Sequence, residues 1–74
     1  LRHVAIGGFM LKWVDVNELA IELSETYPQV DPLTLSFPDL FQKVMDLSEF
    51  DDDPDRCGEK VLEAIQMAWI DEID

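Results

Sequence analysis

Carboxylate side chains are the groups in this sequence best able to do chemistry. A run of acids, Asp51-Asp52-Asp53-Pro54-Asp55, lies between two apolar stretches, and Glu18, Glu22 and Glu25 recur four and then three residues apart. On a helix this spacing places the three glutamates on one flank, where like charges repel each other. Carboxylate oxygens suit Mg²⁺, Ca²⁺, Mn²⁺ and, less selectively, iron, and they attract basic protein surfaces. Each group could equally be an ordinary solvated face or a loop whose acids cap turns.

Catalysis fits the remaining residues poorly. His3 is the only histidine and Cys57 the only cysteine. A general base or a closed zinc site built from His and Cys is therefore not expected. Arg56 beside Cys57 favours a thiolate, but the neighbouring aspartates oppose it and no histidine is near. We predict that the chain is not an enzyme and that Cys57 is an unreactive loop residue.

The aspartate run also fails as a calcium-binding EF-hand. Asp51, Asp53 and Asp55 match the first, third and fifth positions of that loop. However, Arg56 stands where the loop needs glycine, and Leu62 stands where it needs the bidentate glutamate. Any cation bound by these carboxylates should therefore bind weakly and exchange rapidly.

The charge of the whole chain narrows the classes of partner. Among 74 residues, 17 Asp and Glu face five Lys and Arg, giving a net charge of -12, while 47% of the residues are hydrophobic. The charge disfavours nucleic acids and anionic lipid surfaces, and the apolar content disfavours disorder. One cysteine permits no internal disulfide, and we find no signal peptide or membrane-spanning stretch. We expect a monomer in the cytoplasm.

Hydrophobic periodicity predicts three helices that must position these acids. The first begins near Asp15, with Asp15 and Glu18 spaced as a capping box, and it ends before Pro28. The second begins at Ser36, and the third runs from about 59 to 70 or beyond. Residues 31–35 form either a short helical turn or a short extended piece. The expected core side chains are Val16, Leu19, Ala20, Leu23, Leu40, Phe41, Val44, Met45, Leu47, Val61, Leu62, Ile65, Ala68 and Trp69.

This pattern predicts a mainly α, three-helix domain over residues 10–74, either an orthogonal bundle or a helix-turn-helix derivative. Residues 1–9 differ from the rest of the chain, since they contain the only histidine, two adjacent glycines and no acid. Met10 would make a natural start. We interpret residues 1–9 as a partly disordered leader left over from cloning.

Several short motifs, in order and at matching spacing, give the chain a clear likeness. It resembles the IscX family, the small acidic proteins of bacterial iron–sulfur cluster assembly. The motifs that carry the resemblance are Leu11-Lys12-Trp13, Asp15 with Glu18, Tyr27-Pro28 with Asp31-Pro32, Phe37 with Asp39, Asp46-Leu47, Phe50-Asp51-Asp52-Asp53-Pro54, Glu59-Lys60-x-Leu62-Glu63-Ala64-Ile65 and Trp69-x-Asp71-Glu72. Together they span residues 11–72; the Arg56-Cys57-Gly58 entry to the last helix departs from the pattern.

The resemblance implies a fold and a role that composition does not. It implies a modified winged-helix, helix-turn-helix type domain that does not bind DNA. It implies binding to the cysteine desulfurase IscS in competition with the bacterial frataxin homologue. It also implies weak, carboxylate-bound iron, either Fe²⁺ or Fe³⁺, and a role as regulator of cluster assembly or as iron donor.

Site residues can then be assigned as expectations. We expect iron to be bound by oxygen ligands from Glu18, Glu22, Asp51, Asp52, Asp53 and Asp55. The expected partner contacts are Trp13, Glu18, Glu22, Asp51, Asp52, Asp53, Asp71 and Glu72. Trp13 has a competing role as a core residue.

Two alternatives belong to other classes. A helix-turn-helix transcription regulator needs a basic recognition helix, but the second and third expected helices contain only Lys43 and Lys60 as cations. A purely structural acidic subunit without a metal role would fit the same charge.

Overall fold

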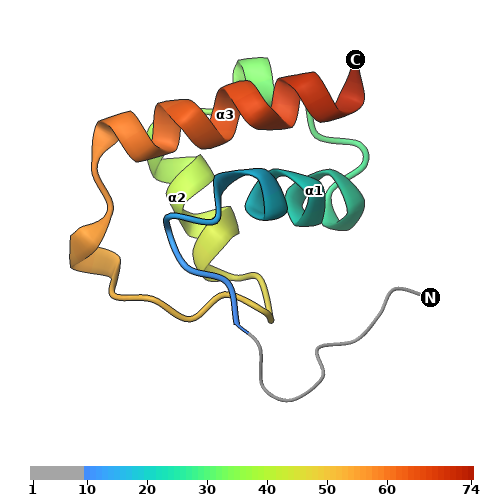
Figure 1. The fold of residues 1–74 in the computed structure, drawn as a ribbon. Helices are drawn as coiled ribbons and strands as arrows, with labels where there is room; N and C mark the ends of the chain where they lie inside the picture. Colours follow the sequence, from blue (N-terminus) through green and yellow to red (C-terminus); the bar gives the residue numbers. More distant parts are fainter. Residues whose placement is uncertain (1–9) are drawn as a thin grey trace.

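Three α-helices and two short 3-10 turns make up the fold (Figure 1). The computed structural model describes residues 10–74. The elements are α1 (Val16–Thr26), η2 (Pro32–Thr34), α2 (Phe37–Met45), η3 (Pro54–Arg56) and α3 (Glu59–Ile73). The predicted mainly α, three-helix domain is confirmed. The interpretation of residues 1–9 as a leader falls outside the described residues.

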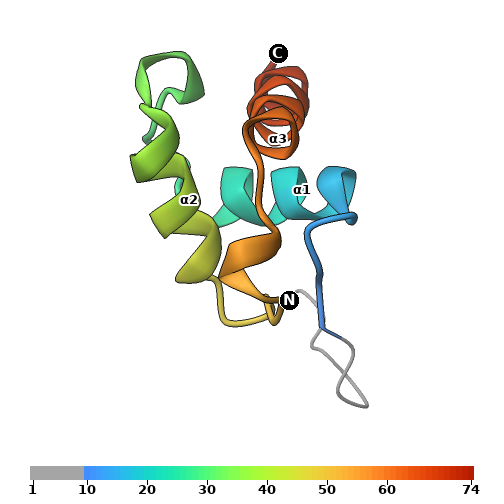
Figure 2. The ribbon, with the colours of Figure 1, turned by 90° about the vertical axis from the view of Figure 1, so that its left-hand side faces the viewer.

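Helices α1 and α3 lie side by side, and α2 crosses behind them in the view of Figure 1 and stands to their left in Figure 2. The contact between α1 and α3 is the most extensive between any two elements of the described chain. Leu19 and Leu23 of α1, Leu40 of α2, and Ile65 and Trp69 of α3 are fully or almost fully buried between them. The helical faces predicted from periodicity therefore form the core.

Polar and proline residues set the helix starts largely as expected. Ser36 Oγ accepts a hydrogen bond from Asp39 N at the start of α2, and Pro38 sits in the first turn, where its missing N–H costs nothing. Gly58 precedes α3 and provides no side-chain cap. The last helix continues to Ile73, three residues past the predicted minimum end at Ile70.

The predicted capping box of α1 is wrong. Asp15 lies at the N-cap position, but its side chain accepts no hydrogen bond from the helix. Its carboxylate instead accepts one from Lys12 N (2.8 Å), while Asp15 N donates to Lys12 O (2.9 Å). The tight turn from Lys12 to Asp15 draws the Asp15 carboxylate away from the helix. It also engages the main-chain N–H of Asp15, which the Glu18 side chain would have to accept from in a capping box.

The connector between α1 and α2 forms a turn rather than a strand. Asp31 caps η2 by accepting a hydrogen bond from Leu33 N (3.0 Å), and Gln66 Nε2 of α3 donates to Pro32 O (2.8 Å). The β structure within residues 10–74 is one isolated parallel bridge between Leu11 and Phe50. This part of the chain thus contains no β-hairpin that would serve as a wing.

Candidate functional site

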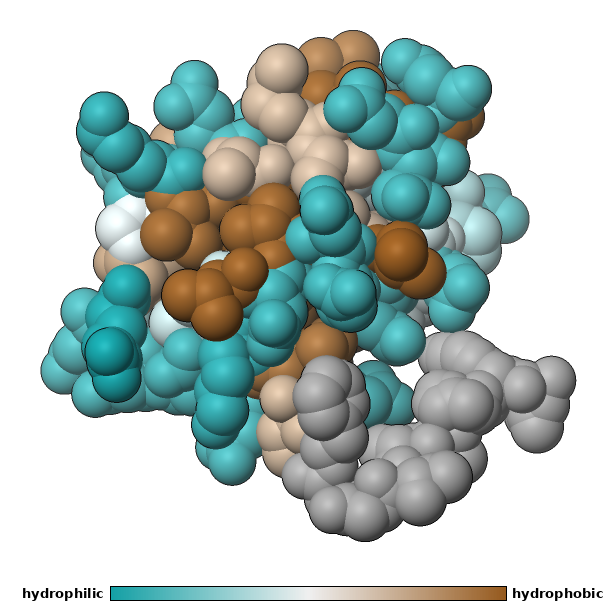
Figure 3. All heavy atoms as spheres, viewed as in Figure 1, coloured by the Kyte–Doolittle hydropathy of each residue, from teal (hydrophilic) through white to brown (hydrophobic). Residues whose placement is uncertain are grey.

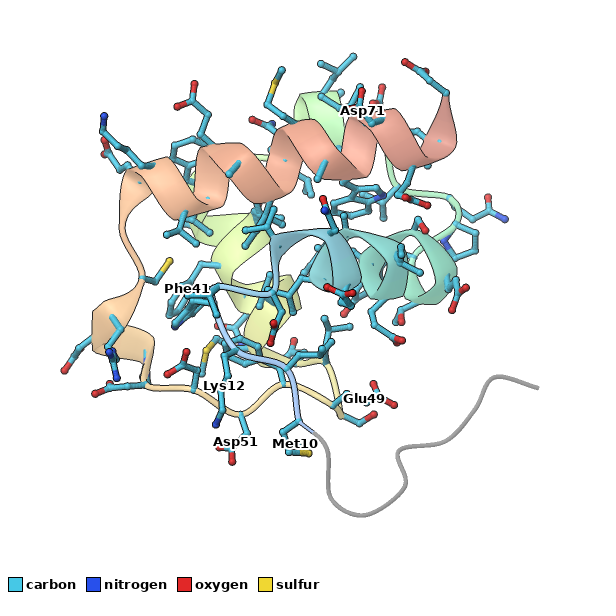
Figure 4. The ribbon with its side chains drawn as sticks, in the orientation of Figure 1. Met10, Lys12, Phe41, Glu49, Asp51 and Asp71 are labelled. Carbon is cyan, nitrogen blue, oxygen red and sulfur yellow. The ribbon has the colours of Figure 1, made fainter. Side chains whose placement is uncertain are left out.

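The acidic loop, residues 49–55, is fixed to the segment that precedes α1. Leu11 N donates to Glu49 O (2.7 Å), and Asp51 N donates to Leu11 O (3.0 Å). Lys12 Nζ donates to the main-chain oxygen of Asp51 (2.6 Å), and the two side chains lie next to each other in Figure 4. Backbone groups on both segments are therefore satisfied by this pairing, which orders an otherwise irregular loop.

Trp13 is the centre of this attachment. Its main-chain N–H donates to Asp52 Oδ2 (2.9 Å), and its indole Nε1 donates to Asp53 O (2.8 Å). Trp13 is only 3% exposed, and its ring stacks on Phe41 (centroids 5.8 Å apart, 17° between planes) and meets Phe50 edge-on at 4.6 Å. Of the two roles considered for Trp13, the structure shows the core role, and little of the ring is left for a partner.

The carboxylate of Asp52 is occupied by the protein itself. Oδ2 accepts from Trp13 N, and Oδ1 accepts from Asp53 N (2.7 Å). These two backbone hydrogen bonds, helped by the nearby charges of Arg56 and Lys12, hold the pKa of Asp52 below its ordinary value of 3.8. Asp52 is thus a structural anion, which joins the acidic loop to the N-terminal segment.

The other aspartates of the loop divide into two kinds. Asp53 Oδ1 accepts from Asp55 N (2.9 Å) and so caps η3, as the turn-capping alternative predicted. The side chains of Asp51 and Asp55 are exposed. The run that looks uniform in the sequence therefore contains one half-buried carboxylate bonded to the N-terminal segment, Asp52, and one exposed carboxylate that caps a turn, Asp53, beside the exposed Asp51 and Asp55.

The acids of α1 and α3 lie elsewhere. Glu18 is exposed and Glu22 half-buried on α1, whereas Asp71, Glu72 and Asp74 are all exposed at the end of α3. Figure 4 shows Asp71 and Asp51 at opposite sides of the molecule. The structure therefore does not gather the predicted partner residues into one patch.

The expected iron ligands do not form a preorganised ligand set. Within residues 10–74, no three His, Cys, Asp or Glu side chains lie close enough together to hold a metal ion. Carboxylates of Asp52 and Asp53 are also committed to backbone N–H groups. The residues present thus do not fit a tightly bound resident metal.

Cys57 shows no sign of activation. The side chain is half-buried, and this burial raises the pKa of its thiol above the ordinary value. Because the thiolate is the reactive form, a raised pKa makes the side chain a poor nucleophile at neutral pH.

Sequence reasoning missed what Leu11, Lys12 and Trp13 do. The tripeptide is visible as a motif, but its partners lie about forty residues away, and each hydrogen bond from Trp13 spans 39 or 40 positions. A tryptophan is large enough to be buried at such a junction, and its N–H then needs an acceptor. That need was the one available signal.

The described residues include no helix long and apolar enough to cross a membrane.

A family model for iron–sulphur cluster assembly matches residues 11–74, which covers the acidic loop, its attachment and all three helices. An uncharacterized protein of Pseudomonas aeruginosa is 61% identical over 64 residues, a stretch that covers 86% of this chain and 97% of the relative. The chain belongs to the IscX family of iron–sulphur cluster assembly proteins.

Proposed function

We propose that the protein is an acidic adaptor of iron–sulphur cluster assembly that docks on a basic surface of the cysteine desulfurase IscS and modulates its activity. The observation that carries the proposal is the set of exposed acids that do no structural work, chiefly Asp71 and Glu72. Negative charge at the C-terminal end of a helix opposes the helix dipole, so these residues weaken the fold locally. A basic partner supplies the missing compensation.

Electrostatic steering explains how such a protein finds its partner. A charge of -12 speeds encounter with a basic surface and repels anionic competitors. Exposed charges are screened beyond about 8 Å at physiological ionic strength, so the complex should weaken with added salt. An acidic frataxin homologue attracted by the same basic surface would compete for it.

Iron is proposed as a loosely held cargo and not as a resident cofactor. Asp51, Asp55 and Glu18 present exposed carboxylates, and Glu22 is close to Glu18 on the same flank of α1. One or two carboxylates with water completing the shell would give weak binding of Fe²⁺ or Fe³⁺. Iron bound to these carboxylates makes the protein less negative and so less attractive to a basic surface of the desulfurase. Iron and the enzyme should therefore weaken each other's binding.

The test compares two double variants with the same net charge, each changed from -12 to -10 by the removal of two acids. Asp71→Asn with Glu72→Gln neutralises two acids at the end of α3, and Asp39→Asn with Asp46→Asn neutralises two exposed acids at the ends of α2. We expect the first pair to weaken IscS binding, measured by NMR titration at low and high salt, more than the second. Equal weakening would show that only total charge matters, and salt-independent affinity would contradict the docking proposal itself.

Ferrous iron is then added to the labelled wild-type protein alone. Broadening confined to Glu18, Glu22, Asp51 and Asp55 supports the cargo proposal. Broadening that is scattered or absent favours a structural acidic subunit.

A further inference from the structure

A groove with basic walls lies within this strongly acidic protein. It has a volume of about 730 Å³ and is lined by Lys12, Arg56 and Lys60, which are three of the chain's five Lys and Arg residues. They come from three separate elements: the segment before α1, the turn η3 and the first turn of α3. The fold therefore brings together cations that the sequence keeps as many as 48 positions apart.

The groove lining contains three cations and one acid, so its net charge is positive. Asp52 is the single acid in its lining, and its carboxylate already accepts hydrogen bonds from two backbone N–H groups. Lys60 lies in the first turn of α3, where a cation is unfavourable because the helix N-terminus is itself positive. Lys12 uses its ammonium on a main-chain oxygen and not on a carboxylate. These positive groups favour an anionic ligand.

Part of the groove lining is aliphatic. Val14 is 85% exposed, and Val61 and Ala64 continue the surface along α3. On the face drawn in Figure 3, apolar side chains gather below α3 between hydrophilic ones. Val14 lies in the turn that is closed by two hydrogen bonds between Lys12 and Asp15. An exposed valine on a fixed turn is a preorganised apolar contact.

We propose that this groove binds a short segment of a partner protein that carries both carboxylate and aliphatic side chains. Aliphatic groups of that segment cover Val14, Val61 and Ala64, while its carboxylates pair with Arg56 and Lys60. The surrounding net charge of -12 repels a long polyanion such as RNA or a lipid surface, because most of its charge would lie outside the groove. A short anionic segment meets only the local positive field.

This proposal is independent of the docking of the desulfurase, since it concerns an acidic ligand and a different surface. Binding of such a segment in the groove would add a second contact to the complex that the exposed acids form with a basic partner. Each contact can be lost without the other.

The test uses NMR titration of the whole chain with an end-capped synthetic peptide of alternating Asp and Leu at up to millimolar concentration. We expect shifts confined to Val14, Val61, Ala64 and the two cations Arg56 and Lys60. Lys60→Gln should weaken binding by roughly 1.5- to 5-fold, as expected for the loss of an exposed ion pair. Lys43→Gln is the matched control with the same charge change, because Lys43 stands over the Tyr27 ring 4.8 Å from its centroid and outside the groove.

Four results would overturn the proposal, the fourth being unchanged affinity of the Val14→Ser variant for the Asp–Leu peptide. One is the absence of shifts in the groove at millimolar peptide. Another is equal weakening by Lys60→Gln and Lys43→Gln. The third is equal binding of a peptide in which Ser replaces Leu, or of inorganic phosphate, which would leave only a cation cluster. Val14→Ser, which should leave the fold intact because Val14 is exposed, must also weaken the Asp–Leu peptide.

Discussion

The acidic loop and the acidic end of α3 look alike in sequence but differ in what their carboxylates do. The Asp52 carboxylate accepts hydrogen bonds from Trp13 N and Asp53 N and so holds the loop to the segment before α1, while the Asp53 carboxylate accepts one from Asp55 N and caps η3. Asp71 and Glu72 are exposed on the last turns of a helix whose dipole they oppose. Acidic side chains are therefore available for binding only where they are not already hydrogen-bonded within the fold. The net charge of the chain does not show which side chains these are.

Trp13→Ala should have the largest effect, and it acts on the loop. Removal of a buried tryptophan side chain costs about 3–5 kcal/mol. The indole N–H that donates to Asp53 O is lost, and the main-chain N–H that donates to Asp52 loses the packed ring beside it. At roughly 0.05–0.15 kcal/mol per residue this cost is a large part of the total stability. We expect the urea unfolding midpoint to fall steeply or the folded state to be lost. Unchanged unfolding would contradict the role of Trp13 as the centre of the attachment.

Variants at the end of α3 should change binding and not stability. We expect Asp71→Asn with Glu72→Gln to reduce affinity for IscS by roughly threefold to tenfold, since exposed ion pairs contribute about 0.2–1 kcal/mol each. Thermal unfolding should remain unchanged or rise slightly, because two charges unfavourable to the helix dipole are removed. Calorimetry on one sample measures both. If this double variant loses stability but keeps its affinity for IscS, the end of α3 has a structural role and not the binding role assigned to it.

A milder change separates the packing of Trp13 from its hydrogen bond. Trp13→Phe keeps most of the aromatic packing against Phe41 and Phe50 but removes the Nε1 donor to Asp53 O. The lost hydrogen bond should cost about 1 kcal/mol, with a further contribution from the smaller ring. Urea unfolding gives the value, and amide exchange at Asp53 and Asp55 reports whether the loop loosens. A cost equal to that of Trp13→Ala would mean that the indole N–H, and not packing, dominates.

The smallest expected effect is the pH dependence of stability that Asp52 contributes. Its pKa in the folded protein is lower than 3.8, so its contribution to stability is present above the unfolded value and is lost as the pH falls through the folded value. Asp52→Asn should therefore be less stable than wild type at pH 6, with the difference shrinking below about pH 4. Asp71→Asn, which removes one exposed carboxylate of the same charge at the end of α3, is the control. Urea unfolding from about pH 2 to pH 6, which brackets this titration, measures both variants.

Local patterns in the sequence predicted the helices well and their junctions poorly. The periodic side chains such as Leu19, Leu40 and Ile65 are buried because helix periodicity is a local property. Leu11, Trp13 and Phe50 also belong to the core, but their burial depends on a pairing between distant segments. The capping box failed for a different, local reason, since the turn from Lys12 to Asp15 competes with the helix for the Asp15 carboxylate.

The candidate site was predictable in composition but not in arrangement. All the acids named from sequence are present, yet nothing local distinguishes Asp51, which is exposed, from Asp52, which is bonded inward. The basic groove was missed altogether, because Lys12, Arg56 and Lys60 lie on three elements and become neighbours only in the folded chain. Sequence spacing reports neighbours along a helix but not across a fold.

The attachment between Leu11 and Phe50 also bears on the order in which the molecule assembles. It joins positions 39 apart in the chain, so a long stretch must be closed before its hydrogen bonds form. The contact between α1 and α3 closes a stretch of similar length, but it is the most extensive contact between elements and buries the large side chains of the core. We therefore expect the helices to associate first and the aspartate run to attach last. In hydrogen exchange, the amides of Leu11 and Asp51 should then open together, and more readily than those of Leu23 and Ile65. The loop that carries the aspartates would then detach without unfolding of the three helices, so its carboxylates would change position while the core stays packed.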